Sequence, residues 1–249
     1  MNKRFLMVIV FVSFLSCDET NHVLYQDSFE KYTIGETPNE PWEKTGKGVA
    51  IIDDTKSFSG SKSVHFVTGE GYQNRAFLGI DHIFPLKNNA YYGSLKMYVE
   101  EASPDGVHWT MIQSSGKVAD ELYSSEIRYG GQHNKKLMAN YETQGVKSDC
   151  WKHSQAKIPE GKWFTLQWYF NGNEDTMQLW LDDVLIESIT VVDSGEGCVA
   201  NGTNGQWKFP IMENVLLGWV DYQTGGGTRN IWIDDVIISL ERINQYVNQ

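Results

Sequence analysis

Apolar and polar residues alternate along seven segments of the 249-residue chain, and many of the apolar positions are β-branched or aromatic. This two-residue period is typical of strands with one buried face. Clusters of glycine, asparagine, aspartate and proline separate the segments. The pattern therefore predicts an all-β sandwich. The predicted strands are Ser61–Val67, Ser94–Glu100, Val107–Gln113, Trp163–Asn171, Thr176–Ile189, Glu213–Tyr222 and Asn230–Ser239.

Two similar Asp-Asp pairs are predicted to differ in structure. Asp182-Asp183 lies between two apolar runs, where a two-residue hairpin turn fits. Asp234-Asp235 lies inside the last predicted strand. An inward-facing carboxylate there needs a partner, and a cation is one such partner.

The N-terminal segment is predicted to be a targeting sequence. Two basic residues precede the apolar run Phe5–Leu15, which is too short to span a membrane, and Ser16-Cys17 follows. This resembles a bacterial lipobox with Cys17 as the lipidated residue, and Asp18-Glu19 resembles a surface-export signal. We therefore expect a bacterial outer-membrane lipoprotein that contacts the membrane only through its lipid. A plain signal peptide with an incidental cysteine is the alternative.

The remaining length fits one large domain. We expect a signal peptide over residues 1–17, a tether over 18–26, one β-domain over 27–240 and a tail over 241–249. The net charge of −11 argues against nucleic-acid binding, which needs clustered cations. A polyanionic sugar is compatible only if the few cations gather in one groove. We expect a monomer.

Two cysteines remain besides Cys17. Cys150 and Cys198 are expected to form a disulfide, because an exported protein meets an oxidising compartment. Two free buried thiols are the alternative. No cysteine or histidine spacing indicates a zinc site.

The stretch "EIRYGGQHNKKLMANYE", Glu126–Glu142, contains several polar side chains that could bind a ligand. On an extended strand, Glu126, Arg128 and Gln132 share one face with Gly130. The guanidinium of Arg128 matches a carboxylate, and Gln132 and Asn140 offer amide donors. The glycines leave a floor without side chains, which a bulky ligand could approach. The alternative is a hairpin turning at the glycine pair, with Arg128 bound to Glu126 or another surface acid.

Three further residues are candidates outside this stretch. His108 is a possible proton acceptor, although a lone strand histidine is more often structural. Trp219 and Asp221 should point one way and Tyr222 the other. Tryptophan and tyrosine can stack on sugar rings, but they also fill the cores of large sandwiches.

A calcium site is also conceivable. Glu30, a carbonyl near Ser59 and Asp234 would supply oxygens if the first and last strands lie side by side. The alternative is two capped strand ends with solvated acids.

Seven segments in order resemble one known family. They are "DSFE", "SGSKS", "VHWTMI", "IRYGGQ", "LMANYE", "LLGWVDY" and "IWIDDV". The set is similar to the fungal cellulose-induced secreted proteins and their glucuronan-lyase-like relatives, from about Asp27 to Ser239. This resemblance implies a concanavalin-like β-jelly-roll of two antiparallel sheets. It also implies kinship with lyases that cleave uronic-acid polymers.

The resemblance further implies roles for individual residues. A structural calcium would be bound by Glu30, Ser59 and Asp234. The residues that match the family's cleft are His108, Arg128, Gln132 and Asn140. The chain departs from its relatives at Glu126, where they tend to carry a histidine, and at Tyr141, which follows the asparagine.

We therefore expect a lyase that cleaves a uronic-acid-containing polysaccharide by β-elimination. Arg128, Gln132 and Asn140 would neutralise the substrate carboxylate. The base and acid would come from His108, Tyr141 or Tyr222, and a tyrosine could be the base only if a cation such as Arg128 lowers its pKa. The expected further substrate contacts are Glu126, His133, Trp219 and Asp221, and the turn is placed at His133–Lys136.

Two alternatives belong to other functional classes. The chain could be a carbohydrate-binding lipoprotein without catalysis. It could also be a sandwich glycoside hydrolase that pairs Glu126 with Asp221 or Glu213.

Overall fold

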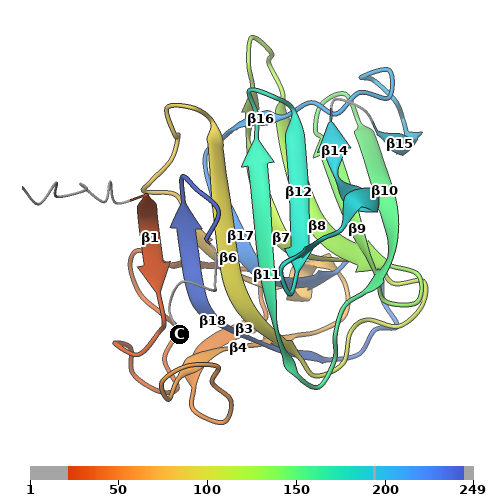
Figure 1. Cartoon of the computed structure of the whole chain (residues 1–249). Helices are drawn as coiled ribbons and strands as arrows, with labels where there is room; N and C mark the ends of the chain where they lie inside the picture. Colours follow the sequence, from red (N-terminus) through yellow and green to blue (C-terminus); the bar gives the residue numbers. More distant parts are fainter. Residues whose placement is uncertain (1–21, 193–194, 244–249) are drawn as a thin grey trace, which may run out of the picture.

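Two antiparallel sheets pack face to face in the computed structural model, which describes residues 22–192 and 195–243 (Figure 1). Apart from strands and turns, these residues form two short 3-10 helices, η1 (Tyr72–Asn74) and η2 (Glu187–Ile189). The expected all-β jelly-roll sandwich is confirmed.

Sheet A has nine strands, in the order β13-β12-β11-β6-β18-β4-β3, with β1 added beside β18 and β14 beside β12. Its strands are β1 (Val23–Asp27), β3 (Val49–Asp53), β4 (Ser63–Thr68), β6 (Ala90–Val99), β11 (Trp163–Asn171), β12 (Thr176–Leu181), β13 (Val184–Leu185), β14 (Val191–Val192) and β18 (Arg229–Ser239).

Sheet B also has nine strands, in the order β15-β10-β9-β8-β7-β17-β5-β2, with β16 beside β7. Its strands are β2 (Glu43–Thr45), β5 (Ala76–Ile80), β7 (Trp109–Val118), β8 (Ser124–Gln132), β9 (Lys136–Thr143), β10 (Ser148–Lys157), β15 (Glu196–Val199), β16 (Pro210–Met212) and β17 (Val215–Asp221).

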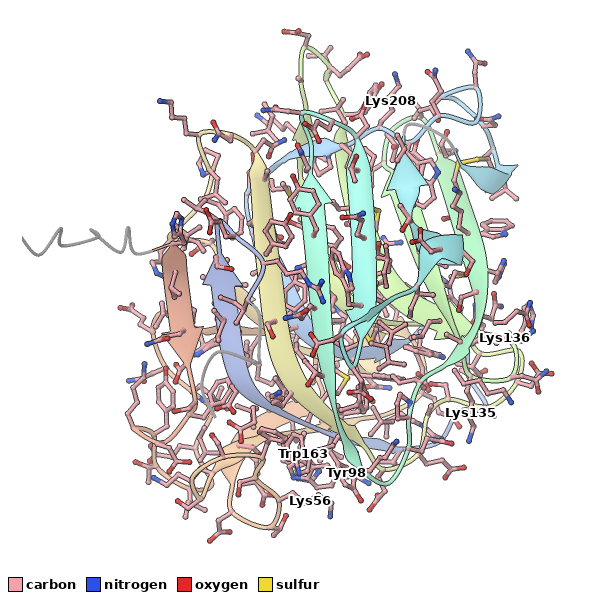
Figure 2. The ribbon with its side chains drawn as sticks, in the orientation of Figure 1. Lys56, Tyr98, Lys135, Lys136, Trp163 and Lys208 are labelled. Atoms are coloured by element: carbon pink, nitrogen blue, oxygen red, sulfur yellow. A yellow bond between two sulfur atoms is a disulfide. The ribbon has the colours of Figure 1, made fainter. Side chains whose placement is uncertain are left out.

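Both predicted turns are found at the predicted positions. Asp182 and Asp183 both have positive φ and join β12 to β13 as a two-residue hairpin. The turn between β8 and β9 falls at His133–Lys135, which all have positive φ, and not at the glycine pair. Lys135 and Lys136 mark this turn in Figure 2.

Aromatic side chains fill the space between the sheets. Trp109 and Trp219 stack with their ring centroids 4.4 Å apart. Trp168 packs so closely on Gly93 that a Cβ at this glycine would lie 2.0 Å from the indole ring. Each of these tryptophan side chains is fully buried, so each one stabilises the fold by the apolar area that it removes from water.

The predicted disulfide between Cys150 and Cys198 is confirmed, and it joins β10 to β15 (Figure 2). The two residues are 48 positions apart in sequence, and closing a loop of that length stabilises a fold by about 4 kcal/mol in the chain-entropy account.

The N-terminal expectations fall largely outside the described residues. The proposed signal peptide and Cys17 precede residue 22, where the description begins. The domain itself begins earlier than expected, because β1 starts at Val23 and pairs with β18. Over residues 22–192 and 195–243, no helix is long and apolar enough to cross a membrane.

The expected calcium ligands meet at one corner of the sandwich. β1 and β18 are neighbours. The loop between β3 and β4 contacts Glu30, which follows β1, and Asp234, which lies on β18. Ser61 N donates to Glu30 Oε1 at 2.8 Å, and Ser59 N donates to Asp234 Oδ2 at 3.1 Å. The loop between β3 and β4 therefore links Glu30 to Asp234 through backbone N–H groups. Among the described residues, no three histidine, cysteine, aspartate or glutamate side chains lie together as a metal site.

The carboxylates at this corner already accept hydrogen bonds from backbone N–H groups. Asp234 is fully buried. Burial raises its pKa to about 6 although the backbone N–H groups of Ser59 and Phe58 oppose the shift. Lys62 Nζ binds the carbonyl oxygens of Glu30 and Tyr32, which leaves the Glu30 carboxylate to face the loop. Calcium binding, with Glu30, Ser59 and Asp234 as its ligands, stays a prediction.

Chelation tests this prediction. We expect EDTA to lower the Tm by about 5–10 °C, because a bound ion stabilises the native state by mass action. The chelator should have no effect on Asp234→Asn, whereas Asp54→Asn, an exposed acid in a nearby turn, should respond like the wild type. A Tm that neither EDTA nor added calcium changes would contradict a calcium site here.

Candidate active site

A row of three acids crosses the outer face of sheet B. Glu126 on β8 pairs with Glu142 on β9, and Glu142 pairs with Asp149 on β10. Their neighbours Ile127, Tyr141 and Cys150 are fully buried in the core. Because side chains alternate between the faces of a strand, the acids point away from the core. Like charges directly opposite each other repel, so this row needs a cation.

Arg128 supplies that cation. It lies on the same face of β8, two residues after Glu126, and only 3% of its surface is exposed. Its Nη2 donates to Glu142 Oε2 at 2.6 Å and also to Glu126 Oε2. Its Nη1 donates to Asn140 Oδ1 at 2.7 Å. Burial acts to lower the pKa of Arg128, but Tyr222, Glu126 and Glu142 together raise it, so the guanidinium stays charged.

Asn140 extends the network to β10. Its Nδ2 donates to Asp149 Oδ1 at 2.6 Å and to the Cys150 carbonyl oxygen at 2.9 Å. Burial raises the pKa of Asp149 above its ordinary range, although Asn140 and Arg128 counteract this. The network thus contains three carboxyl groups and one guanidinium.

His108 and Tyr222 lie beside this network. His108 directly precedes β7, Tyr222 directly follows β17, and Tyr222 N donates to the His108 carbonyl oxygen at 2.9 Å. The two rings stack with centroids 4.7 Å apart, and Arg128 Cζ lies 5.8 Å from the centroid of the Tyr222 ring. Tyr72 stacks on Tyr222 in turn. Two strand ends therefore bring an imidazole and a phenol to the buried guanidinium.

The protonation states of this pair follow from burial. Burial, aided by the charge of Arg128 and by His153, lowers the pKa of His108 to about 3. Its imidazole is therefore neutral at ordinary pH, and its buried Nε2 has no hydrogen-bond partner among the described residues. Burial also raises the pKa of Tyr222, although Arg128 and Thr110 oppose the shift. Tyr222 therefore remains a protonated phenol, which can donate a proton but not accept one.

The glycine pair does not form an open floor. A Cβ at Gly130 would lie 1.9 Å from the carbonyl oxygen of Trp109, and a Cβ at Gly131 would lie 2.2 Å from the Trp109 ring. Glycine is required at both positions because the protein itself occupies the space.

Tyr141 is not brought to this site. It is fully buried on the core face of β9, where its hydroxyl lies 2.8 Å from Thr203 Oγ1. Adjacent strand residues face opposite sides, so Asn140 and Tyr141 cannot share one site. The expectation that Tyr141 is catalytic is therefore corrected, because its side chain lies in the core.

Trp219 and Asp221 also lie away from Arg128. Both are fully buried, and Trp219 Nε1 donates to Asp221 Oδ1 at 2.8 Å. The expected alternation is confirmed, since these two residues share one side while Tyr222 faces the site. Their role as substrate contacts is corrected to a structural one, and a hydrolase pair of Glu126 with Asp221 does not form. Glu213 N donates to the Ser115 carbonyl oxygen, at the turn before β17.

Gln132 and His133 lie at the end of the site. Gln132 is the last residue of β8 and is partly buried. His133 is exposed in the turn, with Nδ1 3.6 Å from Asp105 Oδ1 and its ring 6.1 Å from that of His153. They border the network, and neither of them has a hydrogen bond to Arg128.

Sequence reasoning missed two members of the network. Glu142 lies two residues after Asn140, so strand alternation alone could have placed it on the same face. Asp149 lies on β10, a strand that the pattern did not predict, and only the register between β9 and β10 brings it to Asn140.

Two solved structures are similar to this chain. The structure of Cip1, a cellulose-induced protein, matches with a TM-score of 0.64 and 20% identity over 88% of this chain and 99% of Cip1. An endo-β-1,4-glucuronan lyase from the fungus Trichoderma reesei matches with a TM-score of 0.57 and 13% identity, over 88% of this chain and 96% of the lyase. At these identities the likeness shows the fold.

The comparisons correct the expected localisation. A bacterial outer-membrane lipoprotein was expected, but the solved relatives are a cellulose-induced protein and a lyase from a fungus, which contradicts it. No curated protein sequence matches the chain.

The family model described as the Cip1-like core domain of the polysaccharide-lyase-like proteins matches residues 35–241. This match spans most of the chain and nearly all of the sandwich. The chain therefore belongs to the Cip1-like, polysaccharide-lyase-like family.

Proposed function

We propose that the chain cleaves a uronic-acid-containing polysaccharide by β-elimination at the outer face of sheet B. One observation carries this proposal: a neutral imidazole, His108, packs on a protonated phenol, Tyr222, next to the buried guanidinium of Arg128. These are the base, the acid and the cation that this reaction needs. Family membership supports the reaction class, and the glucuronan lyase among the solved relatives supports the substrate class.

Each residue has a defined step in the proposed reaction. Arg128, with Asn140 beside it, binds the substrate carboxylate and makes the proton on C5 more acidic. His108 Nε2 takes that proton, the C4–O bond breaks, and the electron pair forms the C4=C5 double bond. The Tyr222 hydroxyl gives its proton to the leaving oxygen. Because Nε2 is buried in the free protein, substrate binding has to open the stack of Tyr222 on His108.

The charge around Arg128 limits substrate binding. Glu126 and Glu142 already occupy Nη2, so a substrate carboxylate has to compete with a carboxylate of the protein. The side chain of Glu142 is 42% exposed, whereas that of Glu126 is 18% exposed. Glu142 is therefore the carboxylate that a uronate displaces most readily.

Carbohydrate binding without turnover is the second candidate function. The burial of His108 Nε2 and the compensated charge of Arg128 favour it, because both lower the reactivity of the free site. Mixing the purified protein with glucuronan, alginate and other polyuronates distinguishes the two functions. The ultraviolet absorbance of unsaturated ends should rise if the chain is a lyase. Binding with no such absorbance on any polymer would overturn the lyase proposal and favour the second candidate.

The assignment of base and acid is tested by substitution. His108→Gln and Tyr222→Phe should each lower kcat by about a hundredfold or more, because each removes a proton-transfer group. Tyr141→Phe is the matched control, and its kcat should stay within about twofold of the wild type, since Tyr141 faces the core. An active Tyr222→Phe together with an inactive Tyr141→Phe would contradict the assignment.

Competition for Arg128 is tested by neutralising one acid. Glu142→Gln should lower the KM for a polyuronate by about three- to tenfold, because it removes one of the two carboxylates that compete for Arg128 Nη2 and with it a repulsive charge. Glu36→Gln, an exposed acid in a loop, should leave the KM unchanged. An unchanged or higher KM for Glu142→Gln would show that uronate does not compete with Glu142 at Arg128.

The KM should also depend on pH. Since burial raises the pKa of Asp149, acidification protonates this acid earlier than an exposed one and weakens the repulsion of a uronate. The KM should therefore fall as the pH is lowered from 8 towards 5. Over the same interval His108 of the free protein stays neutral, because its pKa is about 3. A KM that rises on acidification would contradict the charge balance described above.

A further inference from the structure

The outer face of sheet A carries a cavity far from the Arg128 network. It has a volume of about 500 Å³ and lies over β6 and β11, at the end of β11 opposite Trp163. The core of the sandwich separates this face from the outer face of sheet B. The proposed function uses none of the residues that line this cavity.

Two tyrosines form its floor. Tyr92 on β6 pairs with Tyr169 on β11, and their rings stack with centroids 4.3 Å apart. Trp168 and Phe170, on either side of Tyr169, are fully buried in the core, so Tyr169 faces outward. Both tyrosines are only partly buried, which leaves part of each ring accessible.

The floor is held in place before any ligand arrives. Asn171 is 5% exposed, and its Nδ2 donates to the Tyr169 hydroxyl at 2.8 Å. Its Oδ1 accepts the backbone N–H groups of Asn173 and Glu174, which fixes the loop after β11 against the ring. A floor that is already ordered loses little conformational entropy on binding.

The rim offers hydrogen-bonding groups with a surplus of negative charge. Asn173, Glu174 and Glu241 are exposed at the cavity. Arg242, the cation among the described residues that line the cavity, is already engaged: its Nε donates to Gln167 Oε1 at 2.9 Å and its Cζ lies 4.5 Å from the centroid of a Trp180 ring. Burial and Tyr169 raise the pKa of Tyr92, the charge of Arg242 opposes this shift, and Glu174 and Glu241 add to it.

Aromatic rings with amide and carboxylate groups beside them favour a carbohydrate ligand. Aromatic rings pack against the C–H face of a pyranose, and amides and carboxylates bind its hydroxyl groups. An acidic sugar would meet the carboxylates of Glu174 and Glu241, while Arg242 is already bound to Gln167 and packed on Trp180. We infer that this tyrosine cavity is a second carbohydrate site, which holds neutral sugar units of a polysaccharide while the opposite face acts on uronic acids.

Isothermal titration with soluble neutral oligosaccharides tests the inference. Wild-type protein should bind at least one of cellohexaose, xylohexaose and mannohexaose. Variants altered in this cavity should bind oligoglucuronate as tightly as the wild type does. Tyr169→Leu keeps an apolar strand residue and removes the ring, and it should weaken binding of the neutral sugar by about tenfold. Tyr169→Phe keeps the ring and loses only the hydroxyl that accepts from Asn171 Nδ2, so it should bind the neutral sugar more tightly than Tyr169→Leu does.

Phe58→Ala is the matched aromatic control. Phe58 lies in the loop between β3 and β4 and is 48% exposed, and it packs against Trp163, at the other end of β11, where Lys56, Tyr98 and Trp163 gather in Figure 2. It should bind the neutral sugar as the wild type does. No binding of any of the three neutral oligosaccharides by the wild type, or equal binding by Tyr169→Leu, would overturn the inference. Neither result depends on lyase activity, which is measured separately with polyuronates.

Discussion

The burial of one guanidinium shapes the functional face of this protein. Arg128 is almost wholly removed from water in the middle of sheet B, and a buried charge is costly unless it is paired and hydrogen-bonded. Glu126, Glu142 and Asn140 supply the partners. Removing one partner of a buried pair typically costs about 3–5 kcal/mol, because the other charge stays behind. The three neighbouring strands must therefore keep their register, and that register also brings Asp149 to the network.

Burial sets the protonation states on which the proposed chemistry depends, and the guanidinium modifies them. Burial, aided by the positive charge of Arg128, keeps His108 neutral, whereas the same charge works against the burial that keeps Tyr222 protonated. A neutral imidazole, which can accept a proton, and a protonated phenol, which can donate one, therefore lie in contact. The charge of Arg128 is compensated by carboxylates, so the site favours a substrate that can replace one of them. Selectivity for uronic acids would then arise from an exchange of carboxylates at a fixed cation, and not from an empty cationic groove.

Much of the fold could be predicted from the sequence, because local rules decide it. The alternation of apolar residues predicted β11 with its correct bounds, and turn chemistry placed Asp182-Asp183 and the β8–β9 turn correctly. The site was predictable in part. Strand alternation separates Tyr141 from Asn140 and Tyr222 from Trp219, and it aligns Glu142 with Asn140. Asp149 depends on strand pairing between β9 and β10, which no local pattern encodes.

The glycine pair shows a different limit. From the sequence, Gly130-Gly131 could mark a turn or a floor for a ligand. In the structure both glycines accommodate Trp109, whose ring also stacks on Trp219 in the core. The requirement comes from a tryptophan about twenty residues away in the chain, on the neighbouring strand. Packing between strands, which depends on the fold as a whole, decides what such a glycine is for.

A crystal structure of the His108→Gln variant with a short oligoglucuronate tests the central claim most directly. The account predicts a uronate carboxylate within hydrogen-bonding distance of Arg128, with Glu142 turned away from Nη2. It also predicts that C5 of the same sugar lies next to residue 108 and the bridging oxygen next to the Tyr222 hydroxyl. An oligoglucuronate bound elsewhere, with the Arg128 contacts to Glu126 and Glu142 intact, would contradict it.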